Sequence, residues 1–370
     1  MTGAPSGPRW ALGAGGGLVL LVALVDLFVT IFAYDGFTFL TPRMHRLMWA
    51  AMRTATSWLP RDARRTVLSL GSALLLPATL GLWLALEVTG FALMFMPGLA
   101  GGAFRVSHHA GRGAVSAFYL SGGDLTSLTF GDLVPLTPLY RSMVDLETVV
   151  GLSTFTLALT YVLSAFDARA KLDSLYARVR RNAIEPHRPS TIIERRYRHG
   201  DASYLSDFLQ SVVEELDAYN EGLRRFPVAF YFHTRRIERA TPRILSALGR
   251  LIELSRWGLP PSEPLTTDPN LLALVDEYTS VLSRLRRSFL GRLPAPAAPV
   301  PSPDQFAVAV HQPGTEAMAF AELQVEAMRA SGLDFDGVQQ ASYERFCEWL
   351  QFHRSTTAVV GRLQSALGYG

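Results

Sequence analysis

The sequence predicts an all-α membrane protein, in which three transmembrane helices are followed by a helical domain. Of the 370 residues, 49% are hydrophobic and only 18% are charged, whereas soluble domains carry about 25% charged residues. The apolar residues are concentrated in three long runs in the first half of the chain, and the second half shows the spacing of amphipathic helices. The length also suggests two or more domains.

Each of the three runs is long enough to cross a bilayer. Residues 11–34 contain one charge, Asp26, and as a helix would be about 36 Å long, more than the roughly 30 Å of hydrocarbon. Residues 66–104 contain only Glu87, and residues 146–166 have Glu147 at their outer end. Three buried helices of a soluble protein are the alternative, which the scarcity of charge disfavours.

The distribution of arginine predicts the orientation. Residues 35–65 carry six arginines, and residues 167–200 carry eight arginines and a lysine. Between the second and third runs, only Arg105 and Arg112 precede the next apolar stretch. Because basic segments stay in the cytoplasm, we expect an external N-terminus, a cytoplasmic C-terminus and three crossings of the plasma (inner) membrane.

The segment between the second and third runs predicts a re-entrant loop. Residues 114–127 are moderately apolar, but a helix of about 21 Å cannot span the bilayer. The sequence LTFGDLVPLTP follows and is dense in turn formers. Irregular backbone at membrane depth is tolerated only where it is buried in protein or lines a water-filled path. A surface hairpin between two spans is the alternative.

This loop resembles the selectivity filter of tetrameric potassium channels. The seven residues similar to the family's TTVGYGD are Thr126, Ser127, Leu128, Thr129, Phe130, Gly131 and Asp132. Ser121 matches a serine of the pore helix, Pro135 the proline after the filter, and Arg141 the basic residue that opens the inner helix. The resemblance covers residues 66–166, roughly a quarter of the chain. It implies an outer helix, a re-entrant pore helix and filter, and an inner helix.

The resemblance implies a cation channel that conducts potassium passively through a homotetramer, because one loop cannot surround an ion. In such a filter, backbone carbonyls replace the water shell of the ion. Thr129 stands where the family has its first filter glycine, and a β-branched residue is poorly suited to positive φ. We therefore expect weakened selectivity, with some passage of sodium. Asp132 would concentrate cations at the outer mouth.

The inner helix carries the expected pore wall. Leu152, Phe155, Leu159 and Leu163 share one helix face. The family resemblance implies that these residues line the pore cavity and gate it by dewetting. Packing of this helix face against the second span is the alternative. Gly151 falls at the family's hinge position, although glycine also serves close helix packing in membranes. Asp124, on the pore helix, is expected to support the filter through hydrogen bonds with its backbone.

Four regions are expected along the chain. Residues 1–35 form an N-terminal transmembrane helix, residues 36–65 a basic cytoplasmic linker helix, residues 66–166 the pore module, and residues 167–370 a cytoplasmic all-helical domain with a linker at 293–303. In the last region, Asp268 and Pro269 form the start signal of a helix.

Other function classes find little support in the sequence. No nucleophile–base pair or metal-ligand cluster stands out, so we expect neither an enzyme nor a cofactor, and no metal beyond the permeant cation. The net charge of +3 does not favour nucleic acid, and the single Cys347 excludes a disulfide framework. The expected partners are other copies of the chain, membrane lipid and an unidentified cytoplasmic ligand. A non-conducting protein with the channel fold, acting as a signalling or assembly scaffold, is the alternative function.

Overall fold

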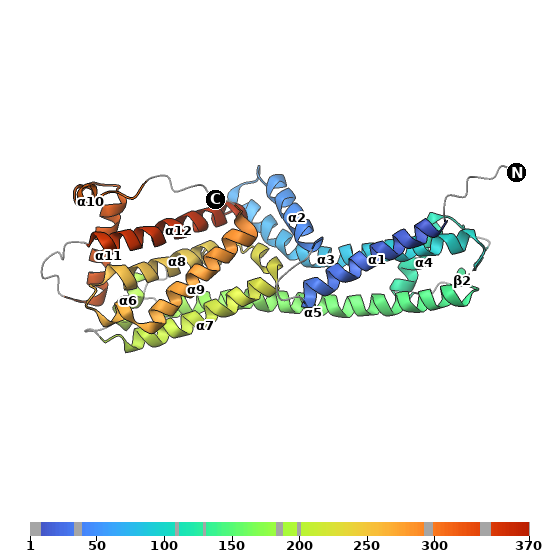
Figure 1. The fold of residues 1–370 in the computed structure, drawn as a ribbon, viewed down its shortest axis with the longest axis horizontal. Coiled ribbons are helices and arrows are strands. Elements are labelled where there is room, and N and C mark those ends of the chain that lie inside the picture. The colour runs from blue at the N-terminus through green and yellow to red at the C-terminus, as the bar shows by residue number, and fades with distance from the viewer. Residues whose placement is uncertain are drawn as a thin grey trace. The chain divides into compact units, whose positions relative to one another are not determined.

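A computed structural model gives the arrangement of the chain (Figure 1). The residues it describes are 9–32, 39–107, 111–128, 131–182, 188–197, 201–291, 299–333 and 342–369. They belong to two compact units. Unit 1 comprises Met1–Ala55, Leu70–Phe166 and Arg224–Phe230, and unit 2 comprises Thr56–Ser69, Asp167–Leu223 and Tyr231–Gly370. The boundaries expected from the sequence remain a prediction.

The three apolar runs are helices, which confirms the prediction of an all-α membrane protein. The helices long and apolar enough to cross a membrane are α1 (Arg9–Phe32), α3 (Arg61–Ala100) and α5 (Pro138–Asn182). α3 begins and α5 ends beyond the apolar runs, within the segments that carry the arginines. The amphipathic linker forms α2 (Thr41–Ala55), and the short segment between the spans forms α4 (Ala114–Leu125).

The first span is packed against the second through two glycines. A Cβ atom added to Gly16 would lie 2.5 Å from the carbonyl oxygen of Gly90, and one added to Gly90 would lie 3.0 Å from the carbonyl oxygen of Gly16. The backbones of α1 and α3 therefore touch, as small residues allow in membrane proteins.

Asp26 fastens α1 to the start of α2 and to α3. Its carboxylate accepts hydrogen bonds from the backbone N–H groups of Phe39 (3.2 Å) and Leu40 (2.9 Å). It also accepts from the Thr41 hydroxyl (2.6 Å) and the Trp83 indole (3.1 Å). Asp26 is buried, and these four donors satisfy its oxygens, as buried polar groups in proteins require.

Two short strands, which the sequence did not suggest, close the loop between α3 and α5. β1 (Phe104–Val106) pairs antiparallel with β2 (Leu133–Pro135), so that Phe104 lies opposite Pro135 and Val106 opposite Leu133. Three residues are too few to show the alternation by which a strand is recognised in a sequence. The pair joins the end of α3 to the segment that follows the filter-like residues.

Helices are the main secondary structure of the described residues of unit 2, which also contains the start of α3 and the end of α5. Its helices are α6 (Ser190–Arg196), α7 (Ser203–Arg225, which ends in unit 1), α8 (Thr241–Glu253), α9 (Pro269–Leu285), α10 (Pro303–Ala309), α11 (Glu316–Ser331) and α12 (Tyr343–Leu367). α8 packs against α9 and α12, and α11 lies across one end of the bundle against α6 (Figure 1). The Asp268 carboxylate caps α9, as its sequence predicts. Most of the expected linker at 293–303 lies outside the described residues.

Candidate functional site

The short helix α4 is held from two sides by the second and third spans. The Ser121 hydroxyl, completely buried, lies 3.0 Å from the Val88 carbonyl oxygen on α3. The same hydroxyl is hydrogen-bonded to Oε1 of Glu147 on α5. Ser121 was singled out by the sequence, whereas Glu147 was read only as a charge at the end of a span. Its role depends on a contact between residues 26 positions apart, which has no local signal.

The end of α4 rests directly on α5. The Thr148 hydroxyl on α5 donates to the Asp124 carbonyl oxygen at 3.1 Å. A Cβ atom added to Gly151 would lie 2.1 Å from the Leu125 carbonyl oxygen. Gly151 therefore allows a close approach between α5 and the last turn of α4. α5 is continuous through this position, and the expected role of Gly151 as a hinge remains a prediction.

The filter-like segment begins with a helix ending that usually requires glycine. The Leu128 N–H donates to the Gly123 carbonyl oxygen (2.7 Å), and the Ser127 N–H donates to that of Asp124 (3.1 Å). Ser127 has φ +60°. These two bonds and the left-handed residue form a Schellman ending, with serine in the place of glycine. A non-glycine residue in this region costs about 1–2 kcal/mol, so backbone strain is already present before Thr129.

The described filter residues lie on the surface of the single chain. Gly131 has φ +70°, as expected for the glycine that the sequence retains. The carboxylate of Asp132 accepts a hydrogen bond from the Tyr119 hydroxyl at 3.4 Å. The exposed residues of this group are Thr126, Ser127, Leu128, Gly131 and Asp132. Thr129 and Phe130 lie outside the described residues, so the expected effect of Thr129 remains a prediction.

Three buried carboxyl groups lie on α3, α4 and α5, one on each helix. Glu87 and Glu147 are completely buried, and Asp124 is nearly so. Oε1 of Glu87 accepts from the Thr154 hydroxyl at 2.6 Å. The second oxygens of Glu87 and Glu147, and Oδ2 of Asp124, have no hydrogen-bond partner within the described part of the chain. The bond expected between Asp124 and the filter backbone is not among the contacts of these residues, and that role remains a prediction.

The predicted pore wall is exposed in the single chain. Leu152, Phe155, Leu159 and Leu163 have between 55% and 65% of their surface exposed. The opposite face of α5 meets α3, where Thr154 bonds Glu87 and the Tyr161 ring lies 5.9 Å from that of Trp83. The alternative from the sequence was that this stripe packs against the second span. In the structure, the opposite face of α5 packs there instead.

This geometry coincides with a region of similarity to known proteins. Residues 79–168 match a protein-family model described as "Ion channel". The match runs from the middle of α3 through α4 and the filter-like segment into α5, and it includes the contacts that hold α4 between α3 and α5. It supports an ion channel domain in this chain and disfavours an enzyme.

A relative covers more of the chain. The "Uncharacterized membrane protein YdjJ" of Bacillus subtilis (strain 168) is 24% identical over 291 residues, which are 78% of this chain and 81% of that protein. The similarity therefore extends into the helical domain and supports a membrane protein. No solved structure shows a significant match to this chain.

Proposed function

We propose that the chain is a potassium-conducting cation channel of the plasma membrane, built as a homotetramer. The observation that carries the proposal is α4, which is clamped between α3 and α5 and is followed by TSLTFGD, inside the region that matches an ion channel model. Backbone that leaves a short helix within the membrane must be buried in protein or line a water-filled path. Four copies meeting at this segment would provide that path.

Each part of the site has a role in this proposal. Carbonyl groups of residues 126–131 replace the hydration shell of the ion, and Asp132 attracts cations to the mouth. The exposed stripe on α5, which includes Leu152 and Phe155, faces the conduction path below the filter. Tetramer formation covers apolar and filter surface that the single chain leaves exposed.

Flux through purified protein in liposomes tests the proposal. We expect potassium uptake that is driven by a concentration gradient and lost in Gly131→Val, because Gly131 has φ +70° and a β-branched residue is strained there. Gly81→Val is the matched control, since nothing lies within 4 Å of the Cβ atom added at Gly81. No uptake by folded, tetrameric protein would contradict the proposal.

The orientation is tested separately by labelling in intact cells. In a background that lacks Cys347, a cysteine introduced at Gly111, in the loop between α3 and α4, should react with an impermeant reagent. A cysteine at Lys171, on α5 after the third apolar run, should not. The reverse pattern would place the filter mouth on the cytoplasmic side.

The alternative is a non-conducting protein that uses the channel fold as a scaffold. Thr129, in place of the family's glycine, favours this candidate, as does a helical unit 2 that accounts for more than half of the chain. A scaffold would form the tetramer and show no flux in the same liposomes.

A further inference from the structure

A cavity in unit 2 gathers arginines beside the cytoplasmic end of α5. Its volume is about 550 Å³. Arg180 reaches it from α5, while Arg243 and Arg250 reach it from α8. The cavity lies well beyond the filter-like segment in sequence and shares no residue with it.

The arginines of this cavity are not equally neutralised. Arg250 forms ion pairs with Glu253 at 3.4 Å and with Glu326. Arg180 and Arg243 have no carboxylate partner in the part of the chain that the structure describes. They are therefore the guanidinium groups available to a ligand.

Further groups around the cavity leave an excess of positive charge. The Tyr176 ring lines the cavity, with the guanidinium carbon of Arg180 6.0 Å and that of Arg239 5.7 Å from its centroid. Glu238 is the lining carboxylate. Arg180, Arg239 and Arg243 exceed Glu238 by two positive charges, and the cluster of Arg250, Glu253 and Glu326 returns one negative charge. The net charge stays positive, which favours a phosphate monoester.

The remaining walls suit an organic group. Apolar side chains of Val179, Ile237, Ile244 and Ala247 line the cavity beside the Tyr176 ring. A volume of about 550 Å³ lies within the usual range for small-molecule sites and far exceeds the size of a free phosphate ion. Guanidinium groups bind phosphate oxygens in a bidentate manner, which adds geometric selectivity to charge.

We propose that this cavity is a regulatory site for a small organic phosphate. Arg180 and Arg243 bind its phosphate group, and the Tyr176 side accommodates the organic part. Because Arg180 and the exposed stripe at Leu152–Leu163 belong to one continuous helix, a ligand that fixes Arg180 biases the position of α5. This effect on gating rests on the proposed channel function, whereas the binding site does not.

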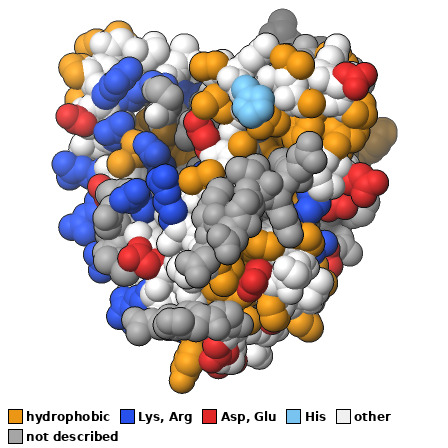
Figure 2. Space-filling model, turned by 90° about the vertical axis from the view of Figure 1, so that its left-hand side faces the viewer, with side chains coloured by type: hydrophobic (Ala, Val, Ile, Leu, Met, Phe, Trp, Pro, Cys, Tyr) orange, Lys and Arg blue, Asp and Glu red, His pale blue; other side chains and the backbone are white. Residues whose placement is uncertain are grey.

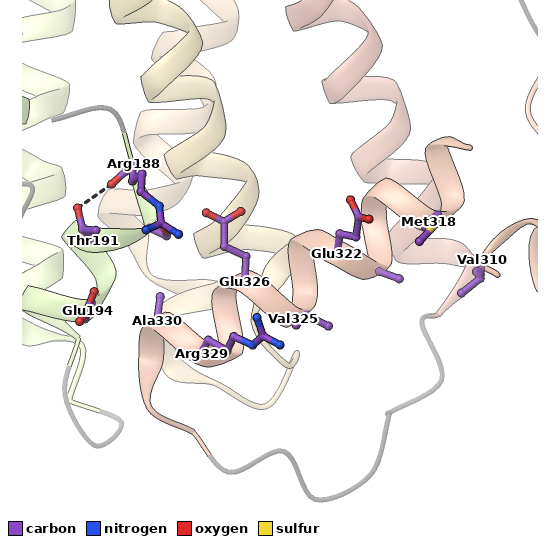
Figure 3. A pocket seen from close by; sticks show the side chains of 12 residues that line it. Arg188, Thr191, Glu194, Val310, Met318, Glu322, Val325, Glu326, Arg329 and Ala330 are labelled. Atoms are coloured by element: carbon purple, nitrogen blue, oxygen red, sulfur yellow. Dashed lines mark hydrogen bonds between the residues drawn. The ribbon is translucent and has the colours of Figure 1, made fainter. Parts of the chain in front are cut away.

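A second cavity supplies the control. It has about 600 Å³ and lies between α6 and α11 (Figure 3). Arg188 and Arg329 line it together with Glu194, Glu322 and Glu326, so negative side chains outnumber positive ones. Figure 2 shows that basic side chains are also common on this end of the molecule. The effect on binding of removing an arginine is therefore compared between the two cavities, because any arginine could attract a phosphate through its charge.

Binding is measured on the full-length chain in detergent by isothermal titration calorimetry. The probes are AMP and ribose 5-phosphate, with inorganic phosphate and adenosine as the two halves of AMP. We expect at least one organic phosphate to bind at least tenfold more tightly than either half. Arg180→Gln and Arg243→Gln should each weaken that binding at least tenfold, and Arg329→Gln should leave it unchanged. Arg180 and Arg243 are exposed, so their substitution should not disturb the packing of unit 2. Unchanged thermal unfolding of each variant will confirm that it folds.

The result that overturns the inference is the absence of binding by both organic phosphates, or binding that neither Arg180→Gln nor Arg243→Gln weakens. The gating effect is tested in liposomes that contain the protein. The probe that binds is added on the side of the membrane on which unit 2 lies. We expect at least a twofold change in cation flux, which Arg243→Gln abolishes and Arg329→Gln retains. Binding without flux under any condition would contradict the channel proposal alone. Flux without binding would contradict the site alone.

Discussion

The Ser121 hydroxyl on α4 is hydrogen-bonded to the Glu147 carboxyl group on α5 while it also lies 3.0 Å from a carbonyl oxygen on α3. A serine hydroxyl has one proton, and a carbonyl oxygen can only accept. If Ser121 donates to the carbonyl of Val88, its contact with Glu147 requires a proton from a carboxylic acid. The lack of a partner for Glu147 Oε2 among the described residues fits the same assignment.

Glu147→Gln should therefore be tolerated, because an amide N–H can donate to Ser121 in the place of the acid. Glu147→Ala leaves the Ser121 hydroxyl with one partner fewer in a buried position, which costs about 1–3 kcal/mol. Thermal unfolding of the purified protein in detergent will check this order. A larger loss of stability in Glu147→Gln than in Glu147→Ala would contradict donation from Glu147 to Ser121.

Gly151→Ala should displace the end of α4. The added methyl group would lie 2.1 Å from the Leu125 carbonyl oxygen, a distance at which the backbone must move. We expect a loss of about 1–3 kcal/mol in stability, typical of overpacking, together with reduced flux. Gly81→Ala, also within a span, has nothing within 4 Å of the added atom and should be neutral or slightly stabilising. Equal stability of the two variants would contradict the close contact.

Asp26→Ala should weaken the attachment of α1. It removes the acceptor of four hydrogen bonds, including those of Thr41 and Trp83, and we expect a loss of several kcal/mol because buried donors remain unsatisfied. Asp26→Asn keeps one acceptor oxygen and should lose less. Limited proteolysis near residue 40, at the start of α2, measures the effect. Equal protection in Asp26→Ala and the unmodified chain would exclude the structural role.

Stability should fall as the pH is lowered from about 6.5 towards 4, in part through His233. Burial lowers the pKa of His233 to about 4, and repulsion from Arg65, Arg169 and Arg64 acts in the same direction. In the unfolded chain the pKa of histidine is about 6.5. Between these values the unfolded state binds more protons, so stability increases with pH in this window. The His233 ring stacks on Tyr369 with centroids 4.2 Å apart.

His233→Phe keeps an aromatic ring beside Tyr369 and removes the titrating group. Its unfolding temperature should therefore depend less on pH between 4 and 6.5. His45, whose pKa burial lowers to about 4, will retain part of the dependence. His311→Gln, at an exposed position, serves as the control. A pH dependence that is unchanged in His233→Phe would show that His233 does not contribute.

The sequence predicted those features that depend on local patterns. The spans at residues 11–34, 66–104 and 146–166 follow from runs of apolar residues, and the start of α9 follows from Asp268 and Pro269. The clamp around α4 could not be predicted, because the contacts of Ser121 with Val88 and Glu147 join residues far apart in the sequence.

The filter-like segment shows the same limit. The sequence places strain at Thr129, by comparison with a family pattern, and this stays a prediction because Thr129 lies outside the described residues. The structure places a left-handed residue at Ser127, where the hydrogen bonds of Leu128 and Ser127 end α4. Serine gives no sign of a left-handed conformation, since glycine usually takes this position. The strain at Ser127 is therefore visible only in the three-dimensional structure.

The central claim is a conducting pore that prefers potassium only weakly. The most direct measurement is the reversal potential of the purified channel in planar bilayers under opposed potassium and sodium gradients, for the unmodified chain and for Thr129→Gly. We predict measurable current, a reversal potential shifted only partly towards that of potassium, and a larger shift in Thr129→Gly, because glycine reaches positive φ without steric cost. Strong potassium selectivity in the unmodified chain would contradict the role given to Thr129, and the absence of current from folded tetramers would contradict the channel itself.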